Sequence, residues 1–458
     1  MTGFIDLWRV SGRVNRRTFA IVGVVAMALK YNIDRIVAAV FERPWDPLQY
    51  WFPGLGATVL QLRPEDGAFA GAMLATAIPF IWLGTALTAK RLRDIGWPVW
   101  LVPVFFVPFV NLLFFVALCV APSAATKTDA DRPRWLRWLP ESDLGSALMG
   151  AAVAPMALLP VGALGIYGLR QYGWGLFVGI PFAQGLFAVL LASVRRSRGL
   201  GECIAIAGGS ALVTGAIIFF AAWEGILCIA MASPIAVTLA VLGGLVGWGM
   251  VCAGSAGSQS AAGAALAIFV ALPALMGAEY QAGSRPVVLP VHTAIDIEAP
   301  PEVVWRHVIA FAELPPATET VFRLGIAYPT RARIEGTGVG AVRHCEFSTG
   351  AFVEPITVWD EPRRLEFDVV AQPRPMDEWS WRDHVDAPHL DDFLVSERGR
   401  FLLTPIPGGT RLTGTTWYRH NIWPEAYWRL WSDGIIHAIH RRVLGHIRNL
   451  ALAEEPAS

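Results

Sequence analysis

The feature that most constrains this chain is a change of residue pattern between positions 260 and 300. Residues 260–276 carry no charge and are mostly apolar, and a run of about 17 such residues is long enough for a membrane-spanning helix. From Leu289 to Ile297 the side chains alternate between two faces, as in a strand with one buried face. We therefore expect the chain to leave the membrane here and to continue as a water-soluble domain.

The composition indicates an integral membrane protein. Of the 458 residues, 54% are hydrophobic and only 16% are charged, and the charges are concentrated after residue 285. The 37 basic and 37 acidic residues cancel. This balance gives no indication of a nucleic-acid partner, so the expected partner is the lipid bilayer.

Apolar runs predict about seven to eight membrane-spanning helices. They cover residues 18–41, 68–87, 99–121, 146–168, 173–194, 203–222, 226–250 and 260–276. Arg9, Arg13, Arg16 and Arg17 precede the first run, and by the positive-inside rule they place the amino terminus in the cytoplasm.

Residues 99–121 leave the sidedness of the later segments open, because Pro103 and Pro108 interrupt this run. If the run crosses once, the arginine-rich loops 127–137 and 195–198 fall outside, against the positive-inside rule. If it folds back as a re-entrant hairpin, both loops fall inside and the carboxyl-terminal domain lies outside. The second alternative fits the basic residues better, although about 23 residues are few for two crossings.

The first run contains a polar pair, Lys30 and Asp34, one helical turn apart. Pairing would lower the cost of placing both charges in lipid. Two interpretations are open: an intrahelical pair near the headgroups or facing a neighbouring helix, or an ion or proton site.

Two motifs flank the first two runs in a recognisable order. They are residues 11–19, Ser-Gly-Arg-Val-Asn-Arg-Arg-Thr-Phe, and residues 90–97, Lys-Arg-Leu-Arg-Asp-Ile-Gly-Trp. Over about residues 1–135 the chain resembles the small bacterial inner-membrane family typified by YhaH, although its first outside loop is longer. That family has no established activity, so the resemblance implies a location and an architecture but no chemistry.

The remaining chain divides into further membrane helices at 145–280, a linker at 281–286 and a folded domain at 287–454. In the domain, a helix follows Pro300 and Pro301, and a long helix closes the chain from Pro424 to about Glu454. Strands are expected at 289–297, 332–335, 341–348, 352–360, 364–371, 393–404 and 410–420. Glycine- and proline-rich turns between the strands predict sequential antiparallel hairpins in an α+β domain.

This order of elements, with the opening motif Ile295-Asp-Ile-Glu-Ala-Pro-Pro-Glu-Val-Val-Trp305, resembles the START and polyketide-cyclase (SRPBCC) superfamily. The resemblance implies a helix-grip fold, in which an antiparallel sheet wraps around the long last helix. It also implies an apolar cavity between the sheet and that helix. The superfamily includes lipid carriers and enzymes, so the fold alone gives no activity.

Strand and helix periodicity give candidates for the cavity wall. His344 and Glu346 share one face of their strand, and the other face carries apolar side chains, so parity does not settle which face is inside. A stripe of residues along the last helix is expected to face the sheet. The stripe is Tyr427, Trp431, Ile435, Ala438 and Ile447. The candidate ligand-binding residues are His344, Glu346, Trp417, Tyr418, Tyr427, Trp431 and Ile435.

No metal or cofactor is expected. His437 and His440 are neighbours on the last helix, but no third ligand accompanies them at a recognisable spacing. The five cysteines form no CxxC pair, and we interpret them as small buried residues. They are Cys119, Cys203, Cys228, Cys252 and Cys345. The aromatic insertion at 373–392 is interpreted as a loop that covers the cavity mouth, touches the membrane or does neither.

Three functions remain open. The domain binds a lipid or other hydrophobic small molecule beside the membrane, or it is a cyclase- or hydrolase-like enzyme in which His344 and Glu346 act as acid and base. In the third, the membrane half is a sensor or transporter that works through Lys30 and Asp34.

Overall fold

The computed structural model describes residues 4–43, 45, 50–51, 67–123, 140, 142–253, 259–283, 286–382, 385, 387–391 and 393–454. The chain forms two compact units. The first is built from Met1–Ile217 and Ala232–Arg285, and the second from Ile218–Met231 and Pro286–Ser458. The second unit thus combines the carboxyl-terminal domain with a short segment from the membrane half of the sequence.

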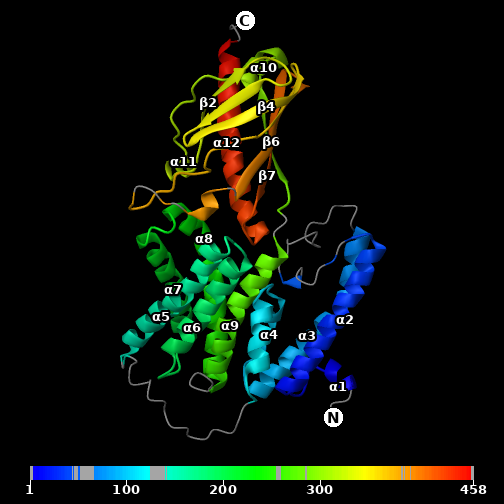
Figure 1. Cartoon of the computed structure of the whole chain (residues 1–458), viewed down its shortest axis with the longest axis vertical. Helices are drawn as coiled ribbons and strands as arrows, with labels where there is room; N and C mark the ends of the chain where they lie inside the picture. Colours follow the sequence, from blue (N-terminus) through cyan, green and yellow to red (C-terminus); the bar gives the residue numbers. More distant parts are fainter. Residues whose placement is uncertain are drawn as a thin grey trace. The chain divides into compact units, whose positions relative to one another are not determined.

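The first unit is helical (Figure 1). Its helices are α1 (Phe4–Trp8), α2 (Arg16–Val40), α3 (Gly67–Ile95), α4 (Val110–Val120), α5 (Asp143–Ala163), α6 (Ile180–Ala192), α7 (Leu200–Phe220), α8 (Ile226–Cys252) and α9 (Gln259–Ala282). Short helical segments lie at η4 (Val99–Phe106), η6 (Leu164–Gly168) and η7 (Gly175–Gly179), and the ends of α7 and α8 extend into the second unit.

Within the described ranges, six helical segments are long and apolar enough to cross a membrane. They are Gly67–Ile95, Asp143–Gly168, Gly175–Ala192, Leu200–Phe220, Ile226–Cys252 and Gly263–Ala282. The helix α2 has 25 residues and a sufficient length, but it carries Lys30, Asp34 and Arg35. The prediction of a multi-pass helical membrane protein is therefore confirmed.

The predicted run at 99–121 is not one continuous helix. It divides into η4 and α4, and between them Phe109 adopts a φ of 63°. Pro108 lacks the N–H that would continue the hydrogen-bond ladder, which accounts for a break at this point. The 11 residues of α4 span about 16 Å, about half of the hydrocarbon core.

The second unit contains a seven-stranded antiparallel sheet in the order β1-β7-β6-β5-β4-β3-β2. The strands are β1 (Leu289–Ile297), β2 (Pro329–Glu335), β3 (Val342–Phe347), β4 (Gly350–Asp360), β5 (Arg364–Asp368), β6 (Leu394–Ile406) and β7 (Gly409–His420). The helices are α10 (Pro301–Ile309), α11 (Thr320–Arg323), η8 (Pro388–Leu390) and α12 (Glu425–Glu454). Beyond β2, Phe311 forms a bridge with Ala332.

The curled sheet packs one face against α12, as Figure 1 shows, and the predicted helix-grip fold is confirmed. Alternate strand residues such as Leu365 and Leu412 are buried beneath Leu444 and Ile447 of the helix. Burying each such side chain contributes about 1.5–3 kcal/mol. The period of two in the strands and the apolar stripe of the helix therefore create one shared core.

The insertion between β5 and β6 contacts the turn between α7 and α8, within the second unit. The backbone N–H of Ile226 donates to the carbonyl of Trp379 over 3.1 Å. The indole N–H of Trp381 donates to the carbonyl of Phe219 over 3.2 Å. The insertion is therefore anchored to a turn between two apolar helices.

Candidate functional site

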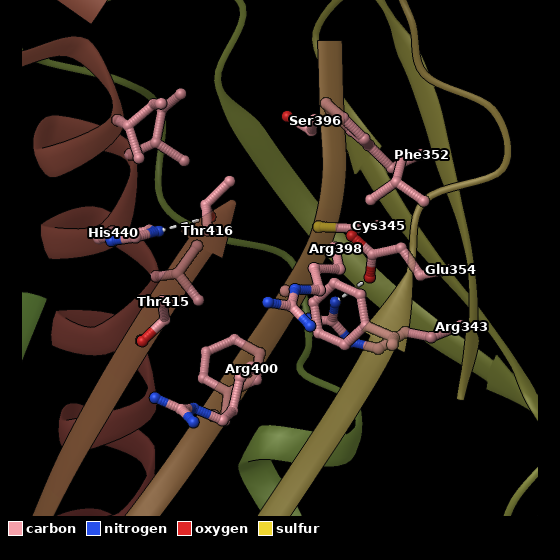
Figure 2. Close-up of a pocket in the computed structure, with 18 of the residues that line it drawn as sticks. Arg343, Cys345, Phe352, Glu354, Ser396, Arg398, Arg400, Thr415, Thr416 and His440 are labelled. Atoms are coloured by element: carbon pink, nitrogen blue, oxygen red, sulfur yellow. Dashed lines mark hydrogen bonds and ion pairs between the residues drawn. The ribbon is translucent and has the colours of Figure 1, made fainter. Parts of the chain in front are cut away.

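A cavity of about 120 Å³ lies between the sheet and α12 (Figure 2). Its wall is formed by β3 to β7 on one side and by α12 on the other. The surface that this wall presents to the cavity is mostly apolar. The apolar residues are Phe347, Phe352, Phe367, Val369, Phe401, Ile436, Ile439, Val443 and Leu444. This is the place that the helix-grip resemblance implies for a ligand.

The size of the cavity limits what it can hold. A cavity of about 150 Å³ accommodates benzene. Pockets for drug-sized ligands have about 300–1,000 Å³. At about 120 Å³, this cavity has room for a group of roughly ring size and not for a whole lipid.

The polar side of the cavity is a buried ion pair between Arg343 on β3 and Glu354 on β4. The two side chains are only 2% and 7% exposed. The Arg343 guanidinium also lies 5.4 Å from the centroid of the Phe367 ring and 5.6 Å from that of Phe401. Burial raises the pKa of Glu354, and the charge of Arg343 opposes this rise.

His440 of α12 reaches the cavity from the opposite side and is held by two hydroxyl groups. Its Nε2 forms a 2.8 Å hydrogen bond with Thr416, visible in Figure 2, and its Nδ1 a 3.0 Å hydrogen bond with Thr293. The same Thr293 hydroxyl lies 2.8 Å from Nδ1 of His437. Burial lowers the pKa of His440 to about 4, so the imidazole is neutral at pH 7.

His344 and Glu346 do not line the cavity. Glu346 pairs instead with Arg331 and Arg333 on β2, and Nε2 of His344 lies 3.9 Å from a carboxylate oxygen of Glu335. The cavity face of β3 carries the alternate residues, Arg343 and Cys345. The structure thus corrects the predicted cavity face of β3 from that of His344 and Glu346 to that of Arg343 and Cys345. Arg343 can lie inside because Glu354 compensates its charge.

Trp417 and Tyr418 of β7 are also absent from the cavity wall. The Trp417 ring stacks with two arginines of β6 that do reach the wall, at 4.2 Å from Arg398 and 5.1 Å from Arg400. Tyr418 is fully buried, and its hydroxyl donates to Asp433 over 2.6 Å. It fills the space between sheet and helix beyond the cavity.

Over residues 427–435, the predicted stripe on α12 is rotated by one residue, about 100° around the helix. The buried positions are Trp428, Ser432, Ile436, Val443, Leu444, Ile447 and Ala451. Ile447 is thus placed as predicted. Trp431 is 37% exposed, Ile435 is half-buried outside the cavity wall, and the Tyr427 hydroxyl donates to the carbonyl of Met231.

Lys30 and Asp34 form the intrahelical pair in the first unit, with both side chains buried. Asp34 also accepts hydrogen bonds from the hydroxyls of Tyr50 and, over 3.3 Å, of Thr76 on α3. The carboxylate is therefore shared among three donors and joins α2 to α3.

The comparisons with known proteins each match only part of the chain. Residues 7–131 match the family described as "Protein of unknown function (DUF805)". The assignment to the YhaH type stays a prediction. A comparison with curated proteins gave no match.

Among solved structures, the chain is similar to norcoclaurine synthase from Thalictrum flavum, with 13% identity, a TM-score of 0.26 and coverage of 38% of this chain and 100% of that one. A protein from Mesorhizobium loti has 16% identity, a TM-score of 0.24 and coverage of 37% and 100%. A protein from Thermus thermophilus has 18% identity, a TM-score of 0.21 and coverage of 37% and 100%. Similarity at this level carries no argument about function, and the superfamily assignment stays a prediction.

Proposed function

We propose that the carboxyl-terminal domain binds a small hydrophobic molecule, or a ring-sized part of a larger one, beside the membrane in which the chain is anchored. The observation that carries this proposal is the apolar cavity between the sheet and α12. Six helices of spanning length on the same chain support a membrane-associated role.

The α12 side and the β3–β4 side of the cavity carry no net charge. Arg343 and Glu354 neutralise each other, and His440 is neutral at pH 7. Burial also raises the pKa of Cys345 to about 12, so its thiol stays protonated. Arg398 and Arg400 of β6 also reach the wall, where both lie against the Trp417 ring, so a polar group of the ligand is expected on the β6 side and its apolar part against the phenylalanine rings.

The enzyme hypothesis has less support. His344 and Glu346 lie outside the cavity wall, and each has a partner on β2. Inside the wall, both ring nitrogens of His440 are engaged by threonine hydroxyls. An acid–base mechanism therefore lacks the pair of residues on which it was predicted to depend.

We also propose that the protein resides in the bacterial inner membrane with its amino terminus in the cytoplasm. The proposal rests on Arg9, Arg13, Arg16 and Arg17, which lie before α2 or in its first turn. A carboxyl-terminal reporter fusion that is active on only one side of the membrane determines the location of the second unit. An amino-terminal tag accessible from outside intact cells would contradict the orientation.

The binding proposal is tested with benzene as the probe on the full chain in lipid nanodiscs. At a free concentration ten times the dissociation constant, a ligand stabilises the folded domain by about 1.4 kcal/mol. We expect benzene to increase the protection of α12 amides against hydrogen–deuterium exchange. The expected size of the increase corresponds to that free energy.

A cavity-filling variant and a matched surface variant provide the control. Val443→Phe places a ring in the cavity, whereas Leu430→Phe adds a ring to the same helix at a position that is 73% exposed. Leu430→Phe is expected to retain the response to benzene and Val443→Phe to lose it. An equal response in both variants would mean that benzene acts through the lipid and would refute the proposal, as would the absence of any response in the wild type.

A further inference from the structure

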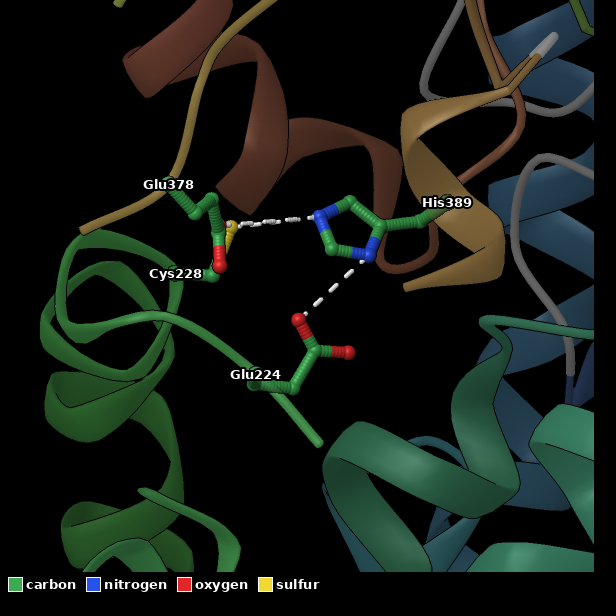
Figure 3. Close-up of side chains that lie close together, drawn as sticks. All are labelled: Glu224, Cys228, Glu378 and His389. Carbon is green, nitrogen blue, oxygen red and sulfur yellow. Dashed lines mark hydrogen bonds and ion pairs between the residues drawn. The ribbon is translucent and has the colours of Figure 1, made fainter. Parts of the chain in front are cut away.

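Four side chains with metal-ligating atoms lie together in the second unit, away from the cavity (Figure 3). They are Glu224, Cys228, Glu378 and His389, and one ligand atom from each lies within 4.8 Å of the others. Glu224 and Cys228 come from the α7–α8 turn and the first turn of α8, and Glu378 and His389 come from the insertion before β6. The cluster is thus assembled from two segments that are far apart in the sequence.

Three of these side chains converge on one point. The Sγ atom of Cys228 lies 3.2 Å from Nε2 of His389, and Oε1 of Glu378 lies 4.0 Å from the same nitrogen. In a tetrahedral zinc site, bond lengths of about 2.3 Å to sulfur and 2.0–2.1 Å to nitrogen separate the two ligand atoms by about 3.6 Å. The Sγ–Nε2 distance is shorter than this value, and the Oε1–Nε2 distance is longer than the roughly 3.4 Å that the same geometry gives for an oxygen and a nitrogen ligand, so small side-chain movements suffice to admit the ion.

The second nitrogen of His389 has a carboxylate beside it. Oε2 of Glu224 lies 3.5 Å from Nδ1, as the dashed line in Figure 3 shows. Histidines that bind a metal through one ring nitrogen usually donate the N–H of the other to a carboxylate or a carbonyl, which fixes the tautomer and the orientation of the ring. Glu224 is placed for this positioning role.

Glu378 is held in a defined position. Its Oε2 accepts a hydrogen bond from the backbone N–H of Gly225, and a Cβ atom at residue 225 would collide with that oxygen. The preceding residue is tied to the domain, because the N–H of Asp377 donates to the carbonyl of Gly325 over 2.8 Å. The other carboxylate oxygen, Oε1, is buried and makes no hydrogen bond within the part of the chain that the structure describes.

The chemistry of the cluster selects the kind of cation. Two carboxylates and a thiol surround one imidazole, so a divalent cation would balance the negative charge that they bring into a buried place. Thiolate and imidazole are ligands of zinc and of the later transition metals, whereas magnesium and calcium prefer oxygen alone. We propose that Cys228, His389 and Glu378 bind a zinc ion through Sγ, Nε2 and Oε1, that water takes the fourth position, and that Glu224 orients the imidazole.

The zinc content of the full chain tests this proposal. The protein is purified in mild detergent without a polyhistidine tag, stripped with a chelator, dialysed against zinc chloride and analysed by elemental mass spectrometry. We expect one zinc ion per chain in the wild type and its loss in Cys228→Ser and His389→Asn. Glu224→Gln is expected to retain the ion with an affinity lowered about 10- to 100-fold.

The matched control is Cys252→Ser, which removes an exposed thiol at the other end of the same helix. This variant is expected to bind zinc as the wild type does, and to show on addition of cobalt the thiolate-to-cobalt charge-transfer absorption that Cys228→Ser lacks. Zinc binding by Cys228→Ser equal to that of the control would overturn the proposal.

A second measurement needs no variant and is independent of folding defects. Zinc is expected to slow the alkylation of Cys228 in the wild-type protein, whereas magnesium and calcium leave it unchanged, with Cys252 as the internal reference. Alkylation of Cys228 at the same rate with and without zinc would count against the site even if the variants failed to fold.

Discussion

Replacing Glu354 by leucine is expected to destabilise the carboxyl-terminal domain strongly, because it removes one partner of the buried ion pair. Leucine has a similar volume and leaves Arg343 without its partner. The arginine side chain is 2% exposed, so water cannot replace the lost carboxylate. Arginine also cannot give up its proton in a protein, so the charge stays buried.

The magnitude follows from the burial of the pair. Removing one partner of a buried ion pair costs about 3–5 kcal/mol because an uncompensated charge is left behind. The contacts of the guanidinium with the rings of Phe367 and Phe401 persist in the variant and do not change this difference. We therefore expect Glu354→Leu to lower the free energy of unfolding of the domain by about 3–5 kcal/mol.

The opposite single variant, Arg343→Met, is expected to cost less. Burial already raises the pKa of Glu354, and without the arginine this carboxyl group can take up a proton and become neutral. The defect of Arg343→Met should therefore decrease as the pH falls, which the defect of Glu354→Leu does not. The double variant Arg343→Met/Glu354→Leu removes both charges and is expected to be about as stable as the wild type.

Hydrogen–deuterium exchange of the β3 and β4 amides in the full chain measures these differences, because those amides exchange by opening of the sheet. The order of stability predicted at pH 7 is wild type and double variant first, then Arg343→Met, then Glu354→Leu. If the two single defects simply added in the double variant, the two residues would not be energetically coupled and the reasoning would be wrong.

Three further predictions follow from other contacts. The unfolded pKa of histidine is about 6.5 and that of folded His440 is about 4, so its contribution to stability is complete above pH 6.5 and decreases as the pH falls towards 4. Between pH 7 and pH 5, exchange measurements should show that the free energy of unfolding falls by about 2 kcal/mol less in His440→Gln than in the wild type. An identical fall in both proteins would contradict a neutral, buried imidazole. Gly225→Ala would place a methyl group against Glu378, so limited proteolysis should cut the insertion faster in this variant than in the control Gly209→Ala. At Gly209 nothing lies within 4 Å of the added atom. Equal rates of cleavage in the two variants would exclude the contact between residue 225 and Glu378. Asp34→Ala leaves Lys30 buried without its carboxylate and should lower the midpoint of thermal unfolding in detergent. The double variant Lys30→Met/Asp34→Leu should restore this midpoint. If Asp34→Ala were as stable as the wild type, the pair would not be structural.

The order and bounds of the elements were largely predictable from local pattern. The alternation from Leu289 to Ile297 coincides with β1, and the prolines at 300 and 301 mark the start of α10. The apolar runs after residue 140 correspond closely to α5 through α9. These elements follow the sequence because a period of two, a period of 3.6 or a long uncharged run is a property of the segment itself.

The cavity face was not predictable, because it depends on pairings between segments. An isolated β3 with Arg343 on one face and His344 on the other gives no reason to place the arginine inside. The reason lies 11 residues away, in Glu354 on the neighbouring strand. The prediction of the aromatic stripe on α12 was wrong for a related reason. Trp431 and Tyr427 are large but lie at the side of the helix, whereas the neighbouring Trp428 is buried.

The order of the sheet has a consequence for association between copies of the protein. A sheet that ends at β1 and β2 offers two rows of backbone groups to which a second molecule could add a strand. The outer side of β2 is already occupied, since Phe311 exchanges two 3.2 Å hydrogen bonds with Ala332 and the N–H of Leu314 donates to Thr330 over 2.7 Å. In β1, Pro290 removes a donor. A strand from a second molecule would therefore meet occupied backbone groups along β2 and a missing donor along β1.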